Sequence, residues 1–541
     1  MLRVDGVVLP EDYTLGNDKV SERVPRRGRR ARHDVQCVSG NSGDPYNPPA
    51  CGLSMAYNAT NGGSQMVVRE SDIVVVPLTS GNADVGKDHT QLGPAQGTHS
   101  LYTGIGDVMA TKLDRISELS AQNPSMIFTS LYHLINFDLL LECHRELDGE
   151  KATGVDRVTK TEYEANLNEN LNDLVERLKR KAYKPQPSLR VYIPKANGKL
   201  RPLGIAAYED KIVQMALMRV LQAVYEPKFR GHMFGFRPNL SQHDAIKELN
   251  RLIEKGKTNY VVDADIKGYF NNMEHERILE LIRFRIADPN ILWLVKKSLT
   301  AGVVEDGKWH ATTKGSEQGN LASPIISNIY MHYTLAQWCD IVFKKQCRGE
   351  CGLVIFADDF VATFQYEAEA KRFLSAVAER FAFFGLELEQ SKTRLVEFGR
   401  FAEENRKARG QGKPETFDFL GFTHYCSRSF KTGRFRVKRK TVRKKLRTKL
   451  TELNLWLKQN RHLRLKDLFA KLNQKLKGHY QYYGITDNSP SIGIYLYRAR
   501  QMLFKWLDRR SQRKSYTWEG FNDLLKIFPL AQPHIYVNIY G

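Results

Sequence analysis

The sequence predicts an α+β fold that continues into an all-helical region. In the middle of the chain, short runs rich in β-branched residues alternate with stretches whose apolar residues recur at helical spacing. After about residue 436 the pattern is helical and strongly basic. The length of 541 residues is enough for roughly two to four domains, because one hydrophobic core stops growing at roughly 250–300 residues.

The first 108 residues differ in composition from the rest. They are rich in Gly, Ser, Asn and Pro and show little periodicity, so we expect a low-complexity, disordered extension at 1–108. The basic cluster at 25–32 has two interpretations, an RNA contact or a solvated run of charge. Helical periodicity begins abruptly at 112–148 and continues at 162–180, where a packed fold should start.

Charge and hydropathy narrow the function classes. Lys and Arg total 82 against 60 Asp and Glu, a net charge of +22 that favours a polyanionic partner such as nucleic acid. No apolar stretch is long enough to span a bilayer, and the N-terminus lacks the order of a signal peptide, so we expect a cytoplasmic protein without a membrane partner. The seven cysteines are scattered, which argues against disulfides. Cys347 and Cys351 could form half of a zinc site, but no second pair follows them at suitable spacing.

The candidate chemistry lies on two strands that carry acidic residues. The apolar runs 259–266 and 352–364 predict strands that bear Asp265 and the pair Asp358 and Asp359. If the strands are neighbours in one sheet, these carboxylates could hold two divalent ions about 4 Å apart, as nucleotide transfer requires. An acidic pair in a turn is often merely solvated, but here apolar residues on both sides argue against that. Asp263 shares a strand face with Asp265, and alternation alone does not choose between them.

Four motifs in order resemble those of bacterial group II intron-encoded reverse transcriptases and maturases. They are VVDADIKGYF (261–270), KGSEQGNLASPIISNIYMHY (314–333), FADD (356–359) and FDFLGFTHY (417–425). The resemblance implies a right-hand polymerase with α+β fingers and palm and an all-α thumb, called domain X. The expected segments are the N-terminal extension and fingers (109–258), the palm with the primer grip (259–430), the helical thumb (431–486) and a basic helical candidate DNA-binding segment (487–541).

The same resemblance implies roles for individual residues. Asp265, Asp358 and Asp359 would be catalytic and would hold two Mg²⁺ ions, with the carbonyl of Ile266 as a further ligand. Phe270 would exclude a 2′ hydroxyl from the incoming nucleotide. The other nucleotide-binding residues would be Lys195, Arg201, Gln318, Gly319 and Lys392. Lys195 and Arg201, on two strand-like arms around Asn197-Gly198, could instead be exposed hairpin charges, and Lys392 could be a plain surface lysine.

Nucleic-acid contacts are expected at three places. Phe419, Leu420, Gly421 and Phe422 resemble the primer grip, although a purely structural turn is the alternative. Arg237, in GFRP (235–238), is a candidate template contact. The basic thumb residues are Arg436, Lys438, Arg439, Lys440, Arg443 and Lys444, for which a solvated face is the alternative. Tyr480, Tyr482 and Tyr483 could stack on bases or pack in the core.

The implied function is RNA-directed DNA synthesis by a protein that also binds its intron RNA and assists splicing and retrohoming. The implied partners are the intron RNA, an RNA template with its primer, target DNA and deoxynucleoside triphosphates. Two alternatives stay open: an RNA-binding splicing cofactor with weak or no polymerase activity, and a defence-type reverse transcriptase without an intron. Phe356, Asn271 and Glu317 depart from commoner versions of the motifs, and no Cys/His-rich nuclease segment follows residue 486.

Overall fold

The computed structural model describes residues 2–4, 7–9, 106–194, 200–511 and 515–540. The chain divides into two units, Met1–Val68 and Arg69–Gly541. In the first unit, β1 (Leu2–Val4) and β2 (Val7–Leu9) pair in antiparallel fashion. The rest of the expected extension up to residue 105, including the basic cluster at 25–32, lies outside the described residues. All further description concerns the second unit.

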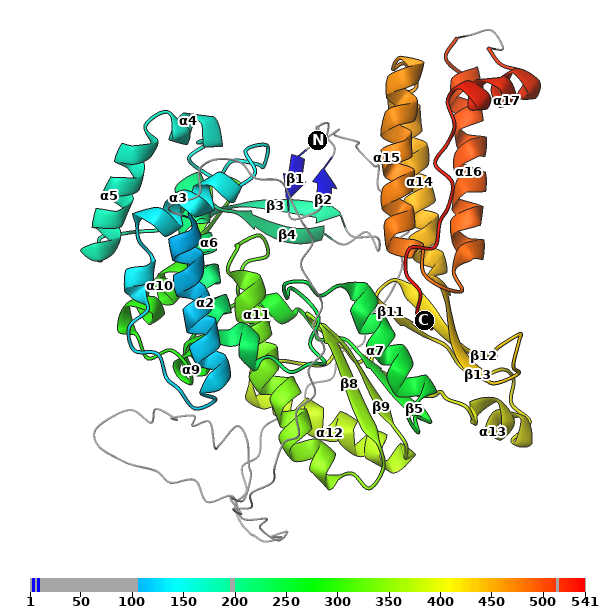
Figure 1. Ribbon diagram of the computed structural model, residues 1–541, viewed down its shortest axis with the longest axis horizontal. Helices are drawn as coiled ribbons and strands as arrows, with labels where there is room; N and C mark the ends of the chain where they lie inside the picture. Colours follow the sequence, from blue (N-terminus) through cyan, green and yellow to red (C-terminus); the bar gives the residue numbers. More distant parts are fainter. Residues whose placement is uncertain (1, 5–6, 10–105, 195–199, 512–514, 541) are drawn as a thin grey trace, which may run out of the picture. The chain divides into compact units, whose positions relative to one another are not determined.

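Helices form the first part of the second unit around a central buried helix, α6 (Tyr208–Tyr225), which has the bounds that its apolar pattern predicts (Figure 1). The expected helix at 112–148 is interrupted, because residues 123–136 form turns and a short 3-10 segment. Ser120 donates to the carbonyl of Val224 and ties the first helix to the end of α6. The helices that precede α6 are α2 (Gly106–Gln122), α3 (Phe137–Glu146), α4 (Lys160–Glu164) and α5 (Leu167–Lys179).

A four-stranded sheet, which we call the fingers sheet, has the order β4-β3-β6-β7. The strands β3 (Ser188–Pro194) and β4 (Leu200–Ile205) form the two arms predicted around Asn197-Gly198. Their turn, which contains Lys195, lies outside the described residues. A second hairpin adds β6 (Val303–Glu305) parallel to β3, followed by β7 (Lys308–His310).

The palm sheet has the order β10-β5-β9-β8, so two segments about a hundred residues apart in sequence lie side by side at its centre. Its strands are β5 (Tyr260–Ala264), β8 (Cys351–Phe356), β9 (Asp359–Phe364) and β10 (Arg394–Glu397). The helix α7 (Gln242–Glu254) packs on the face that carries Val361, while α12 (Glu367–Phe383) packs on the opposite face, where Phe381 meets Phe360. Both faces of the sheet are therefore covered, as its apolar strands require.

The remaining palm elements connect these sheets. The helix α11 widens into π-helical turns at His332–Ala336 and Cys339–Phe343. No helix in the described ranges combines the length and the hydropathy that a bilayer span requires. The connecting helices are α8 (Tyr269–Asn272), α9 (His275–Arg283), α10 (Pro289–Leu299), α11 (Ser323–Met331) and α13 (Ala402–Ala408).

A three-stranded sheet, β11-β12-β13, follows the palm. Its strands are β11 (Phe417–Phe419), β12 (Phe422–Arg428) and β13 (Phe435–Thr441). The expectation that the chain is helical from residue 436 was therefore wrong, because 435–441 pairs along its whole length with β12. Basic residues there alternate with apolar ones at a period of two, which fits a strand and not a helix.

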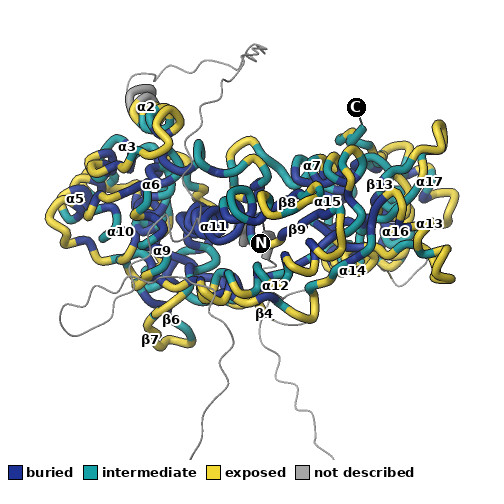
Figure 2. The backbone as a smooth tube through the Cα atoms, turned by 90° about the horizontal axis from the view of Figure 1, so that it is seen from below, coloured by how far each residue is buried: buried dark blue, intermediate teal, exposed yellow. Residues whose placement is uncertain are grey.

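The thumb begins at Arg443 and contains four helices around one core. They are α14 (Arg443–Asn460), α15 (Leu465–Tyr483), α16 (Ser489–Asp508) and α17 (Trp518–Ile527). Leu457, Leu476 and Leu503 belong to one buried cluster, so the domain boundary expected between 486 and 487 falls inside a packed unit. Tyr480 and Tyr483 are buried in this cluster, which excludes stacking on nucleotides for them (Figure 2).

Two arginines expected to contact nucleic acid are hydrogen-bonded to protein groups. Arg439 is fully buried and donates to Asn250 and to the carbonyl of Val437, so its assignment as a nucleic-acid contact was wrong. Arg237 is partly buried and donates to Glu226 and to the carbonyls of Arg230 and Met233. Its contact with the template stays a prediction.

Arg436 is also tied to protein groups. It pairs with Glu254, with Nη1 and Oε2 3.1 Å apart, and lies over the ring of Tyr540. Lys440, by contrast, is exposed. Arg436 and Lys440 share one face of β13, so the partners Glu254 and Tyr540, and not strand alternation, distinguish them.

We expect Arg439→Ala to lower the free energy of unfolding by about 3–5 kcal/mol, because it removes a large, fully buried side chain and leaves Asn250 and the carbonyl of Val437 without this hydrogen-bond donor. The matched variant Lys440→Ala, one residue along the same strand, should change it by less than about 0.5 kcal/mol. Denaturant unfolding of both variants checks this. Equal effects would mean that Arg439 is not the buried anchor of β13.

Candidate active site

The acidic residues meet because β5 and β9 are antiparallel neighbours. Ala264 is opposite Phe360, so the next position in the register places Asp265 opposite Asp359. Asp358 precedes Asp359 in the turn between β8 and β9, where Phe356 pairs with Asp359. The structure therefore brings together the three carboxylates that the sequence singled out.

The turn that carries Asp358 is strained and tightly packed. Ala357 has a φ of 57°, a conformation that residues with a Cβ seldom adopt. Gly235, from the GFRP motif, lies against it, since a Cβ on Gly235 would be 2.2 Å from the backbone nitrogen of Ala357. The carbonyl of Gly235 is held by the side chain of Asn328 at 2.8 Å. Strain of this kind, of order 1–3 kcal/mol, persists only where the surroundings impose it.

Burial and mutual repulsion raise the pKa values of the clustered acids. Burial is the main cause that raises the pKa of Asp358, with Asp265 adding to it and Arg201 and Lys392 opposing it. The pKa of Asp359 rises to about 7, first from burial and then from Asp358 and Asp265, although the side chain is open to solvent through the pocket. Lys392 partly compensates this negative charge, with its Nζ 2.6 Å from Oδ2 of Asp265.

The oxygen donors fit divalent cations chemically. Hard cations such as Mg²⁺ take carboxylate and carbonyl oxygens, and a cluster of acids with raised pKa values lacks the counter-charge that such ions supply. Among the described residues, however, no group of three or more His, Cys or acidic side chains already forms a metal shell. Cys347 and Cys351 are free thiols and belong to no such group either.

Asp263 has a different environment from Asp265. It is directly opposite Arg394 on β10, and the two side chains form an ion pair at 3.2 Å. Burial raises its pKa to about 6 while Arg394 opposes the shift. Asp265 raises the pKa values of both Asp358 and Asp359. In the register of β5 and β9, Asp263 is opposite the core residue Val361, whereas Asp265 is opposite Asp359. The geometry thus separates two acids that strand alternation left equivalent.

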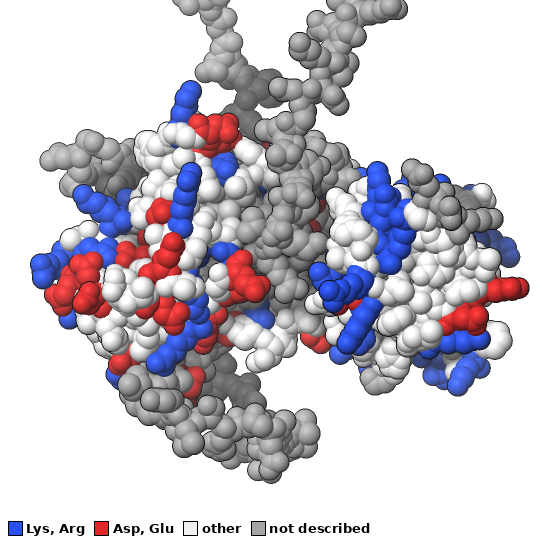
Figure 3. Space-filling model, turned by 90° about the horizontal axis from the view of Figure 1, so that it is seen from above, with Lys and Arg blue, Asp and Glu red and all other residues white. Residues whose placement is uncertain are grey.

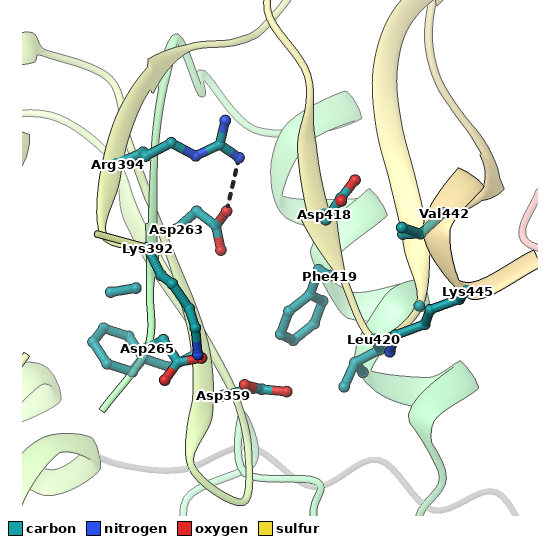
Figure 4. A pocket seen from close by; sticks show the side chains of 13 residues that line it. Asp263, Asp265, Asp359, Lys392, Arg394, Asp418, Phe419, Leu420, Val442 and Lys445 are labelled. Atoms are coloured by element: carbon teal, nitrogen blue, oxygen red, sulfur yellow. Dashed lines mark hydrogen bonds and ion pairs between the residues drawn. The ribbon is translucent and has the colours of Figure 1, made fainter. Parts of the chain in front are cut away.

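A cavity of about 340 Å³ opens beside the acids (Figure 4). Asp265, Asp359 and Lys392 line one side, and Leu420 and Lys445 line the opposite side. Gly421 also lines the cavity, and Leu420 and Gly421 both have positive φ values, 46° and 86°, which make a tight turn at its wall. Phe419 and Phe422, the outer residues of the motif, are buried and anchor the turn.

Three charged residues that line this cavity were missing from the sequence-based active site. They are Arg394, Asp418 and Lys445. Alternation in β11 would have indicated Asp418, because its neighbours Phe417 and Phe419 are core residues. Lys445 comes from the first turn of α14, and nothing in the basic run of this helix distinguishes it from its neighbours.

The other candidate nucleotide residues surround the same acids. The carbonyl of Phe270 accepts from the backbone of Ser316 at 2.8 Å, which ties this ring to the loop before Gln318. Gly319 lies directly on β4, since a Cβ there would be 2.3 Å from the carbonyl of Gly204. Arg201, on the same strand, is exposed and close enough to lower the pKa of Asp358.

Comparison with known proteins agrees with this geometry. Residues 193–424 match the family model "Reverse transcriptase (RNA-dependent DNA polymerase)", and residues 443–522 match "Group II intron, maturase-specific domain". Together they cover more than half of the chain. The chain therefore contains a reverse transcriptase domain followed by a group II intron maturase-specific domain, and it is homologous to group II intron-encoded proteins. The second match begins at Arg443, where α14 begins, so the maturase-specific domain is the helical thumb.

Three relatives show the extent of the similarity. Group II intron-encoded protein LtrA of Lactococcus lactis subsp. cremoris is 36% identical over 41% of this chain and 37% of its own. Protein YkfC of Escherichia coli (strain K12) is 36% identical over 40% of this chain and 59% of its own. An uncharacterized 91 kDa protein in a cob intron of Schizosaccharomyces pombe is 30% identical over 46% of this chain and 31% of its own. The reverse transcriptase thus aligns with less than two thirds of each of these relatives.

Because the folded-state pKa of Asp359 is raised to about 7, its stabilising contribution is complete below the unfolded value near 3.8 and is lost as the pH rises through 7. In EDTA, the wild-type protein should therefore lose melting temperature between pH 5 and pH 8 relative to Asp359→Asn. Thermal unfolding of both proteins at the two pH values checks this. Equal losses of melting temperature in the wild type and in Asp359→Asn would show that Asp359 is not in a repulsive cluster.

Proposed function

We propose that this chain is an active RNA-directed DNA polymerase that uses an RNA template, a primer and deoxynucleoside triphosphates. The observation that carries the proposal is the register of β5 and β9, which puts Asp265 beside Asp359 and the Asp358 turn. An enzyme with these substrates would work in the cytoplasm.

Asp265, Asp358 and Asp359 would hold two Mg²⁺ ions, with the carbonyl of Ile266 as a further ligand. When bound, the ions activate the attacking 3′ hydroxyl and stabilise the charge on the leaving pyrophosphate. Lys392, whose Nζ is 2.6 Å from Oδ2 of Asp265, would release that carboxylate to the ions, and its ammonium would then be free to face the leaving group.

The remaining residues would position the substrates. Arg201 would bind the triphosphate, and Phe270 would restrict the space at the 2′ position of the sugar. Its ring meets Tyr269 and Phe236 edge to face, which fixes its direction. The backbone turn at Leu420 and Gly421 would hold the end of the primer, and Tyr482 on α15 braces that turn by donating to the carbonyl of Leu420 at 3.0 Å.

Asp358→Ala should abolish primer extension on an RNA template and leave RNA binding within about twofold, because the acid is needed for metal binding and not for the basic surface. The matched control is Asp263→Asn, which should retain most activity, since Asp263 is neutralised by Arg394. Extension assays with filter binding measure both quantities. Full DNA synthesis by the Asp358 variant would refute the polymerase assignment.

We further propose that the thumb binds group II intron RNA as a maturase. Arg443 and Lys444 are exposed at the start of α14, whose first turn contains no acidic residue. Positive side chains are unfavourable at the positive end of a helix dipole unless an anion is bound there. On the face drawn in Figure 3, Lys and Arg side chains gather over the thumb helices. This second function is favoured by the match to the maturase-specific domain.

Replacing Arg443 and Lys444 together by Gln should lower the slope of log affinity against log salt by about 1 to 2, because each phosphate contact contributes about 0.7–0.9. Intron RNA affinity measured between about 50 and 200 mM salt checks this. Lys526→Gln and Lys471→Gln, exposed thumb lysines away from the start of α14, are the controls. An unchanged slope in the α14 variant would contradict the proposed contact.

A further inference from the structure

One face of the fingers sheet is apolar and ends in an exposed tryptophan. Residues paired in the register of a sheet point to the same side, so Ile205, Leu189, Val304 and Trp309 form one row across β4, β3, β6 and β7. Trp309 is 60% exposed, which is unusual for the largest apolar side chain. Figure 2 shows the hairpin that carries it as an exposed segment.

The ring of Trp309 is held in place on one side. A Cβ on Gly302 would be 2.4 Å from Nε1 of Trp309 and 2.9 Å from its Cε2, so the indole lies against a residue that cannot carry a side chain there. The Asp306-Gly307 turn, with φ values of 49° and 76°, is a two-residue hairpin turn that fixes the register of Trp309 opposite Val304. The indole is therefore held against Gly302 while much of the side chain stays exposed to solvent. Because the ring is already fixed in place, little side-chain entropy would be lost when a base stacks on it.

The charge on this face indicates the class of ligand. By strand alternation, Ile193, Val191 and Leu203 are on the same side as Trp309, together with Arg201. No strand residue on this side is acidic among the described residues of the sheet. Glu305 is on the opposite face, where it pairs with Arg190.

This face is continuous with the polymerase site. Arg201 is close enough to Asp358 to affect its pKa, and it does not line the cavity that contains Leu420, Gly421 and Lys445. The fingers sheet therefore approaches the acids from outside the primer-grip cavity, where a template strand would enter. Trp309 is three strand spacings from β4, about 14 Å, and its row crosses β4 at Ile205, four residues or about 14 Å along the strand from Arg201. The two side chains are thus about 20 Å apart along the sheet, which is the length of about six stacked nucleotides.

We propose that Trp309 is a stacking platform for the unpaired RNA template, about six nucleotides ahead of the nascent base pair. The inference rests on the proposed polymerase function and adds a binding site to it. An aromatic ring with one supported face stacks on any base, so the site would hold the template without reading its sequence.

The test is equilibrium binding of primer–template duplexes whose RNA template has an unpaired extension of either one or ten nucleotides, without deoxynucleotides. Trp309→Ala should weaken binding of the long extension by about tenfold and leave the short extension unchanged. Trp309→Phe should retain most of the affinity. An abasic residue moved along the extension should weaken wild-type binding at about the sixth position and have no further effect on Trp309→Ala.

The matched control is Phe430→Ala, which removes a fully exposed aromatic ring from the loop between β12 and β13, outside the fingers sheet. It should bind both substrates as the wild type does. Wild-type affinity of Trp309→Ala for the long extension, or equal losses on both substrates, would overturn the proposal. Primer extension by the wild-type protein in the same preparation is a separate readout, so failure of the polymerase assignment is distinguished from failure of the stacking site.

Discussion

The antiparallel pairing of β5 with β9 is the constraint on which the site depends. It joins segments about a hundred residues apart and sets Asp265 opposite Asp359 at the point where the strands end. A slip of one residue would turn Asp265 to the other face of the sheet. The register is fixed because both faces are covered, by α7 on the side of Val361 and by α12 on the side of Phe360.

The same pairing concentrates negative charge that the protein itself only partly neutralises. Lys392 reaches Asp265, and Arg394 neutralises Asp263, but Asp358 and Asp359 have no ion pair among the described residues. The strained Ala357 and the close approach of Gly235 hold these two acids in place against their repulsion. A site that is destabilised without its cations is expected where preorganised charge is part of the chemistry.

The sequence predicted the parts of this fold that local patterns determine. The helix at Tyr208–Tyr225 and the arms of the β3–β4 hairpin follow from apolar spacing and from Asn197-Gly198. The three acids were identified from the strands and from the resemblance, but their proximity depends on a long-range pairing that no spacing gives. Arg439 was assigned wrongly because residues 435–441 were predicted to be helical. In the strand that they form, alternation places Arg439 on the buried face with Val437. Lys445 was not predicted to line the active-site cavity, because folding alone brings it next to Gly421.

The central claim is that Asp265, Asp358 and Asp359 bind divalent cations jointly. Anomalous diffraction from crystals that contain Mn²⁺ would test it most directly, since the peaks locate the ions without reference to activity. The account predicts peaks within about 2.5 Å of carboxylate oxygens of both Asp265 and Asp358. Peaks beside Asp263 and Asp418 alone, or none in this cavity at saturating Mn²⁺, would contradict it.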